Sequence, residues 1–196
     1  MHSVNISGRV SPGRGPVSRY VSMSYKYPVM LLAILVGYGP WLTYAACNTD
    51  IVPDAPDARY IDHFDGTVSD TRTGLMWTKC PGGLTGNDCS VGTEQLYTWG
   101  EGLIAVKTIN ASGGFAGYAD WRVPNINELA SLVERQCYQP AINLNVFPAT
   151  LPQAKYWSSS QSPNETLWIL DFRLGDITSI GSITNKLSVR LVRGGP

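Results

Sequence analysis

The chain has 196 residues, of which 43% are hydrophobic and 15% are charged, and its formal net charge is zero. This low charged content excludes a disordered acidic or basic chain, and no run of like charges indicates a nucleic-acid-binding tail. With 20 Gly and 13 Pro, the sequence predicts a loop-rich globular protein of one domain, with or without a processed segment.

The charges are unevenly divided along the chain. Four basic residues and no acidic residue precede residue 47, so residues 47–196 carry a net charge of −4. The basic start leads into an apolar run over residues 29–42 and then into small residues at 43–46. This order is typical of a secretory signal peptide, and the run is short for a membrane span of about 20 residues.

We therefore expect residues 1–46 to be an export signal, within which residues 1–22 are an extension from an upstream start codon. The expected location is the periplasm, the cell surface or the extracellular space. Two alternatives remain open: an uncleaved membrane anchor, and a lipoprotein lipidated at Cys47, which follows two alanines. Contact with a membrane is expected only through the signal segment or a lipid on Cys47.

All four cysteines lie after the expected signal, and an even number in an oxidising compartment indicates disulfides. Three connectivities are possible. The flexible loop between Cys80 and Cys89 closes easily, so we predict this pair, which leaves Cys47 with Cys137. No Cys-x-x-Cys is present and His63 is the one histidine after residue 46, so we predict no metal site and no cofactor.

The first part of the exported chain is a polar, proline-bearing arm over residues 47–58, followed by the domain itself over residues 59–196. Residues 59–64 alternate in polarity and predict a short strand. Two further β-rich stretches, 67–70 and 75–78, flank a Thr-Arg-Thr-Gly turn and predict a hairpin.

Two helices are predicted from capping boxes, in which a Ser, Thr or Asn precedes a Glu by three residues. Residues 98–101 have this spacing and predict a helix over 99–111, ended by Gly-Gly. Residues 125–128 repeat it and predict a helix over 126–134.

The pattern changes to a period of two after residue 137. Four stretches alternate or are β-rich: 155–160, 166–172, 176–180 and 187–192. Because short loops separate most of them, an antiparallel sheet is expected. The predicted fold class is α+β, with two helices packed on antiparallel sheet in a loop-rich, disulfide-stapled domain.

Three motifs in this order resemble the bacterial Lcl C-terminal domain family, named after a Legionella collagen-like adhesin. The motifs are Asp70-x-x-Thr-Gly-Leu-Met-Trp77, Gly117-Tyr-x-Asp-Trp-Arg-Val-Pro-Asn-x-x-Glu-Leu129, and Tyr156-Trp-Ser-Ser-Ser160 followed by Val189-Arg-Leu-Val-Arg-Gly-Gly195. The resemblance covers residues 59–194. It implies a C-type-lectin-like fold that is related to formylglycine-generating enzymes, and an association with sulfated polysaccharides and host surfaces. The chain has no collagen-like repeat, so the multivalent stalk of the adhesin is absent.

The second motif contains polar residues that could form a site, but a structural role explains them. We expect Arg122 to bond a carboxylate, Asp120 or Glu128, and Asn125 to cap the second helix with Glu128. Trp121 is expected in the core.

A ligand site is predicted on the loops of the carboxy-terminal strands. A sugar site needs an aromatic face and planar polar groups, and cations would bind a sulfate. The candidates within this short span are Asn164, Glu165, Trp168, Asp171, Arg173, Asp176 and Lys186. Trp168 and Asp171 are three residues apart on an expected strand, so they point to opposite faces unless the strand has a bulge.

The leading prediction is an exported, non-catalytic module that binds polysaccharide. The alternative is a structural or protein-interaction subunit of an envelope or pilus-like assembly, with an envelope protein as partner. Catalysis ranks lowest: a serine triad would depend on His63, no Gly-x-Ser-x-Gly is present, and the cysteines that would hold copper are assigned to disulfides. A pair of carboxylates for glycoside hydrolysis stays open. Calcium lacks a clear ligand set, and the charge of −4 disfavours nucleic acid.

Overall fold

The computed structural model of the protein describes residues 46–163 and 166–194. The predicted export signal, apart from Ala46, lies outside these ranges. Within them, no helix combines the length and the apolar character that crossing a membrane requires.

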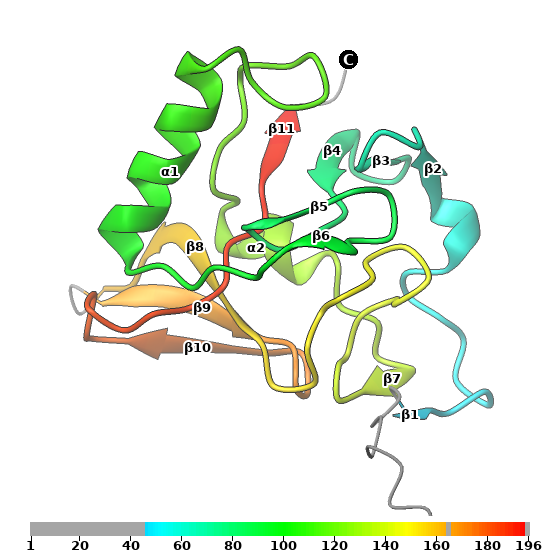
Figure 1. Ribbon diagram of the computed structural model, residues 1–196. Helices are drawn as coiled ribbons and strands as arrows, with labels where there is room; N and C mark the ends of the chain where they lie inside the picture. Colours follow the sequence, from blue (N-terminus) through cyan, green and yellow to red (C-terminus); the bar gives the residue numbers. More distant parts are fainter. Residues whose placement is uncertain (1–45, 164–165, 195–196) are drawn as a thin grey trace, which may run out of the picture. The chain divides into compact units, whose positions relative to one another are not determined.

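The described chain folds into short strands and two helices connected by long loops (Figure 1). In chain order the elements are β1 (Ala46–Cys47), a 3₁₀ turn η1 (Asp57–Arg59), β2 (Tyr60–Asp62), β3 (Thr67–Asp70), β4 (Leu75–Thr78), β5 (Leu84–Thr85), β6 (Val91–Gly92), α1 (Trp99–Ala111), α2 (Ile126–Ala130), β7 (Cys137–Tyr138), β8 (Lys155–Gln161), β9 (Leu167–Asp171), β10 (Asp176–Ile180) and β11 (Val192–Gly194).

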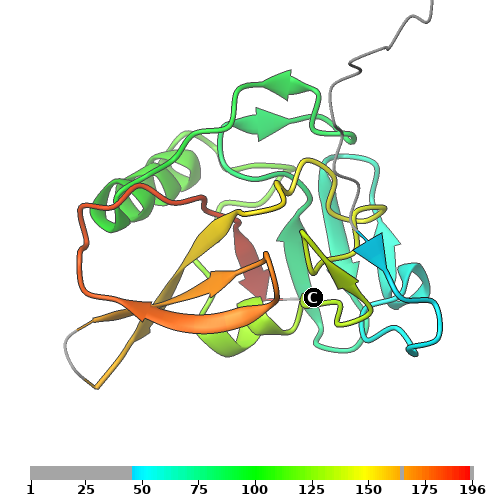
Figure 2. The same ribbon diagram turned by 90° about the horizontal axis from the view of Figure 1, so that it is seen from below.

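Two antiparallel sheets carry the domain. One has the strand order β11-β4-β3-β2 and the other the order β10-β9-β8, and the pairs β1-β7 and β5-β6 complete the strands of the described residues. In both views the three-stranded sheet and the β2-β3 edge lie on opposite sides of the domain (Figures 1 and 2). The predicted α+β class with antiparallel sheet is confirmed.

The β3-β4 hairpin forms as predicted because its turn residues satisfy the backbone. Asp70 accepts hydrogen bonds at its side chain from the amide of Arg72 (3.0 Å) and the hydroxyl of Thr73 (2.7 Å). Gly74 has a φ of 69°, in the left-handed region that favours glycine, and its amide donates to the carbonyl of Asp70. The hairpin therefore begins and ends where the local sequence dictates.

Both helices start at the predicted capping boxes, formed by Thr98 with Glu101 and by Asn125 with Glu128. Helix α1 has the predicted bounds. Helix α2 ends at Ala130, four residues earlier than predicted, because Val133 pairs with Ile142 in a β-bridge. The apolar spacing that predicted more helix instead reflects burial of residues 132 and 133 in the core.

Two clusters of buried side chains form the core, and β9 lies between them. Leu170 belongs to the cluster that also contains Trp77, Leu129 and Phe147, whereas Ile169 belongs to the cluster that contains Trp157 and Trp121. Alternate residues of β9 thus face different halves of the core.

The predicted strand over residues 187–192 is wrong except at its end, since β11 begins at Val192. The segment passes from one sheet to the other and changes its backbone partner along the way. Its bridges and backbone hydrogen bonds go in turn to Tyr97, Tyr156, Gly82 and Thr78. Alternating polarity does not describe the burial here, because Ser188 and Arg190 are buried as well as Val189 and Leu191, and no single neighbouring strand continues the ladder.

Both predicted disulfides, Cys80–Cys89 and Cys47–Cys137, are confirmed. The second ties the arm to the domain at the β1-β7 pair. A lipid thioether needs the same sulfur atom of Cys47, so this disulfide and lipidation at Cys47 exclude each other. In the structure, the sulfur of Cys47 is in the disulfide.

Candidate functional site

A groove of about 480 Å³ lies where the start of β8 meets the segment before β11. Residues 151–155 line one part of it and residues 186–188 line another, together with Glu94 and Leu96. This volume is within the usual range for small-molecule and sugar sites, about 300–1,000 Å³.

The groove forms because these two runs are hydrogen-bonded at its base. The amide of Ser188 donates to the carbonyl of Lys155 (3.0 Å), and the amide of Trp157 donates to the carbonyl of Ser188 (3.0 Å). Beyond this junction the first run leaves the sheet as an irregular loop that contains Pro152. The two runs therefore separate from a common base.

The lining of the groove combines polar and apolar side chains. Leu96 and Leu151 are 50% and 55% exposed, although both are apolar. Lys155 and Lys186 supply two cations, and Glu94 supplies a carboxylate that accepts a hydrogen bond from the hydroxyl of Ser188 (2.6 Å). Apolar surface beside charged and amide groups is the combination that sugar rings require.

The two lysines have loose ion pairs. Lys155 Nζ lies 3.5 Å from Asp171 Oδ2, and Lys186 Nζ lies 4.0 Å from Glu101 Oε2. Their side chains are 46% and 62% exposed. Exposed pairs of this kind contribute about 0–1 kcal/mol, so an anionic ligand can displace the carboxylates.

Four predicted ligand residues lie at this end of the three-stranded sheet. Lys186 lines the groove, and Asp171 lies at its edge through the contact with Lys155. Asp176 is the cross-strand neighbour of Asp171. Arg173 is exposed in the turn between β9 and β10 and does not line the groove.

The structure does not bring Trp168 to the same place. Trp168 is half-buried and pairs with Ser179 farther along β9, and the β9-β10 register has no bulge that would turn it to the face of Asp171. The predicted ligand residues Asn164 and Glu165 lie outside the described residues. The predicted set is therefore only partly assembled.

The groove also contains residues that the sequence did not point to, namely Glu94, Leu96, Leu151, Gln153 and Lys155. They belong to irregular loops or to the first residue of a strand, and they lie up to 94 positions from their contacts, as with Glu94 and Ser188. No periodicity identifies such residues.

The second motif has the structural role that was predicted. Arg122 makes two hydrogen bonds of 2.7 Å to the carboxylate of Glu128, Asn125 caps α2, and Trp121 is 2% exposed. Burial acts to raise the pKa of Glu128, but hydrogen bonds from Arg122 and the Asn125 amide outweigh it and hold the pKa below its ordinary value. Asp120 pairs with Arg193 at 2.7 Å.

A second, apolar cavity of about 340 Å³ lies beside the Cys80–Cys89 loop. Loop residues 80–85 line one side, and Ile109 and Phe115 line another. None of its lining side chains is charged, so it offers no cation to an anionic ligand.

The histidine considered for catalysis has a serine partner but no cavity. His63 Nε2 lies 2.8 Å from Ser69 Oγ on the exposed β2-β3 hairpin. Neither residue lines a described cavity, and no carboxylate among the described residues bonds to His63. In the same ranges of the chain, no three His, Cys, Asp or Glu side chains gather in a way that could hold a metal ion.

Comparison with known proteins gives one family. The profile of the Lcl C-terminal domain matches residues 66–193, which include both sheets' central strands and both helices. A search of curated proteins finds no match to this chain.

Proposed function

The chain belongs to the Lcl C-terminal domain family, and from this premise we propose that it is an exported, non-catalytic surface-interaction domain that binds polysaccharide. The family resemblance favours an adhesin-like role. Two helices, antiparallel sheets and two disulfides are compatible with the C-type-lectin-like arrangement that we assign to the domain.

The groove at the start of β8 supports this function best. It is the largest of the described cavities, and it places two loosely paired lysines beside exposed apolar side chains. A polysaccharide chain presents apolar C–H faces together with hydroxyl or sulfate groups, and both kinds of surface find partners here.

The test is binding of the exported protein to an array of sulfated and neutral glycans at low and physiological salt. Salt screens exposed charge pairs, so binding of a sulfated chain should weaken as salt rises. Lys186→Ala should reduce that affinity about fivefold, equivalent to about 1 kcal/mol. Arg173→Ala, which removes a nearby cation outside the groove, is the matched control.

Other results would redirect the proposal. Salt-tolerant binding that is lost in Trp168→Ala would place a neutral sugar on the indole instead of in the groove. No binding of any glycan by a folded protein with both disulfides would reject polysaccharide as the ligand.

One observation favours a protein partner as the second candidate. Strand β10 pairs with β9 on one side, and its other edge has no strand partner among the described residues. Ile177 on this strand is 46% exposed, and the strand has no Lys, Pro or bulge to protect the edge. An envelope protein could add a strand here, and Ile177→Lys would then abolish its capture without changing glycan binding.

A further inference from the structure

The buried side chain of Arg190 has no carboxylate partner. Arg190 is 0% exposed, and none of the ion pairs within the described ranges includes it. Its Nε atom is buried without a hydrogen-bond partner. A buried charge is unfavourable unless it is paired or well hydrogen-bonded. The contacts of its two terminal nitrogens therefore have to explain why arginine is present.

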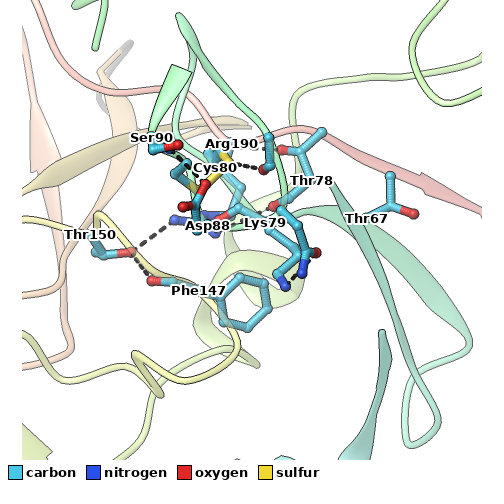
Figure 3. The surroundings of a disulfide bond; sticks show 12 residues. Thr67, Thr78, Lys79, Cys80, Asp88, Ser90, Phe147, Thr150 and Arg190 are labelled. Carbon is cyan, nitrogen blue, oxygen red and sulfur yellow. Dashed lines mark hydrogen bonds between the residues drawn. A yellow bond between two sulfur atoms is a disulfide. The ribbon is translucent and has the colours of Figure 1, made fainter. Parts of the chain in front are cut away.

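These nitrogens join two separate parts of the chain (Figure 3). Nη1 donates to the backbone carbonyls of Thr78 and Lys79, directly before the Cys80–Cys89 loop. Nη2 donates to the hydroxyl of Thr150 (2.9 Å) and to that of Tyr156 (3.4 Å). Arg190 therefore connects a strand end next to a disulfide with the region around residues 150–156.

The second pair of contacts brackets the groove. Thr150 directly precedes the groove-lining run 151–155, and Tyr156 directly follows it. The other lining run, 186–188, leads to Arg190 along the chain. The guanidinium of Arg190 therefore contacts the residues that flank one lining run, and Arg190 itself follows the other run by two positions.

Backbone hydrogen bonds fix the end of the run 151–155, from the Phe172 amide to the Ala154 carbonyl (3.0 Å) and from the Ser188 amide to the Lys155 carbonyl (3.0 Å), so the anchor matters most for its start. Residues 139–154 form no helix or strand, and within this stretch the aromatic core anchor next to the groove is Phe147. The guanidinium carbon of Arg190 lies 4.7 Å from the centre of the Phe147 ring, and Thr150 donates to the Phe147 carbonyl (3.0 Å). Thr150 and Phe147, which are bonded to each other, therefore both contact the guanidinium of Arg190.

We propose that Arg190 is a positioning residue that holds the groove-lining run 151–155 in its binding geometry. This inference rests on the proposed function for its consequence in binding, although the ordering of the run is measurable without any ligand. Arginine is required because its planar fork donates in several directions at once, whereas a lysine ammonium at this distance cannot reach both sets of acceptors.

The experiment compares Arg190→Met with Arg193→Met, in the full chain expressed for export. Arg193 is on the same segment and also lies over an aromatic ring, that of Tyr118 at 3.8 Å, but it does not contact the groove lining. Two quantities are measured: hydrogen exchange of the amides of residues 151–155, and the Kd for sulfated dextran, with unsulfated dextran of equal length as a second probe.

We expect Arg190→Met to speed exchange at the Ala154 amide, which bonds to the Leu151 carbonyl (3.1 Å), at least tenfold more than at β9 amides. The Kd for sulfated dextran should rise at least fivefold. Arg193→Met should change neither quantity. Equal acceleration at all amides, or none at residues 151–155, would overturn the positioning role.

The two proposals fail separately. If exchange accelerates locally while the Kd stays unchanged, Arg190 orders the run but the groove is not the polysaccharide site, which overturns the role in binding. If the wild type binds no dextran of either kind, the exchange result still decides the positioning role. Should Arg190→Met not fold, Thr150→Val removes one acceptor and Thr150→Ser restores it, so local exchange should accelerate in the first variant and not in the second.

Discussion

Charged side chains are paired very differently in two regions of the domain. Beside the amino-terminal arm, Arg59 and Asp70 form a pair whose side chains are 5% and 0% exposed. At the groove, Lys155 and Lys186 lie 3.5 and 4.0 Å from their carboxylates and are largely exposed. A buried pair cannot separate without loss of the fold, whereas an exposed, long pair exchanges readily with solvent or with a ligand.

The difference indicates which charges belong to the fold and which are available for binding. The arm side of the domain is held by buried charge and by the Cys47–Cys137 disulfide. The groove side is held by backbone junctions and by Arg190, and its lysines take no part in holding it. The predictions below test this division, beginning with the arm.

Removal of the Cys47–Cys137 disulfide should have the largest effect on stability. The bridge closes a loop of 90 residues, so in the chain-entropy model the double variant Cys47→Ser/Cys137→Ser loses about 4–5 kcal/mol of unfolding free energy. The Cys80–Cys89 bridge closes 9 residues, and its removal should cost about 2.5 kcal/mol. Urea denaturation measures both, and a larger loss for the short loop would contradict the prediction.

Asp70→Asn should be next in size, at about 3–5 kcal/mol, because it leaves the buried Arg59 without its counter-charge. Burial acts to raise the pKa of Asp70, but hydrogen bonds from Arg59 and Thr73 outweigh it and hold the pKa below its ordinary value. The stabilisation is therefore present above about pH 4 and is lost as the pH falls through the lowered pKa.

Denaturation at several pH values tests this sign. The difference in unfolding free energy between the wild type and Asp70→Asn should be largest near pH 7 and should decrease below about pH 4. The matched control is Asp120→Asn: the carboxylate of Asp120 is 59% exposed in its pair with Arg193, so this variant should change stability little at any pH.

Glu134→Gln should cost about 1–3 kcal/mol. The buried carboxylate of Glu134 accepts hydrogen bonds from the amides of Asp54, Ala55 and Gln136, at 2.7 to 3.1 Å. The neighbouring Arg135→Ala removes a 74%-exposed partner of Asp54 and should have little effect. Faster hydrogen exchange at Ala55 in the first variant alone would show that the carboxylate holds the arm.

The helix starts, the β3-β4 hairpin and the short disulfide were predictable because the relevant contacts are local. The capping boxes span three residues, the β3-β4 turn is held by Asp70 and Gly74 within four, and the short disulfide closes a glycine-rich loop. The family motifs placed these elements in one domain. The pairing of the other two cysteines then followed by elimination.

The groove was not predictable from local patterns. In its lining, Ser188 is hydrogen-bonded to Glu94, 94 positions earlier in the sequence. Its proposed anchor Arg190 is hydrogen-bonded to Thr150 and Thr78, which lie 40 and 112 positions earlier. Alternating polarity predicted a strand over residues 187–192, but it could not show that Ser188 and Arg190 are also buried or that the segment changes partners between sheets. Lys186 was predicted as a cation for sulfate without its neighbour Lys155, whose position depends on this long-range packing.

The smallest effect on stability, and the sharpest test of the division between the two regions, comes from Lys155→Ala/Lys186→Ala. Because both pairs are long and exposed, the double variant should unfold within about 1 kcal/mol of the wild type. Its affinity for sulfated dextran should nevertheless fall more than tenfold, since two cationic contacts of about 1 kcal/mol each are lost. The dependence of Kd on salt should also become shallower, because fewer screened charges take part in binding. A variant that lost stability instead, and kept its affinity, would mean that these lysines belong to the fold in the same way as Arg59 and that the ligand binds elsewhere.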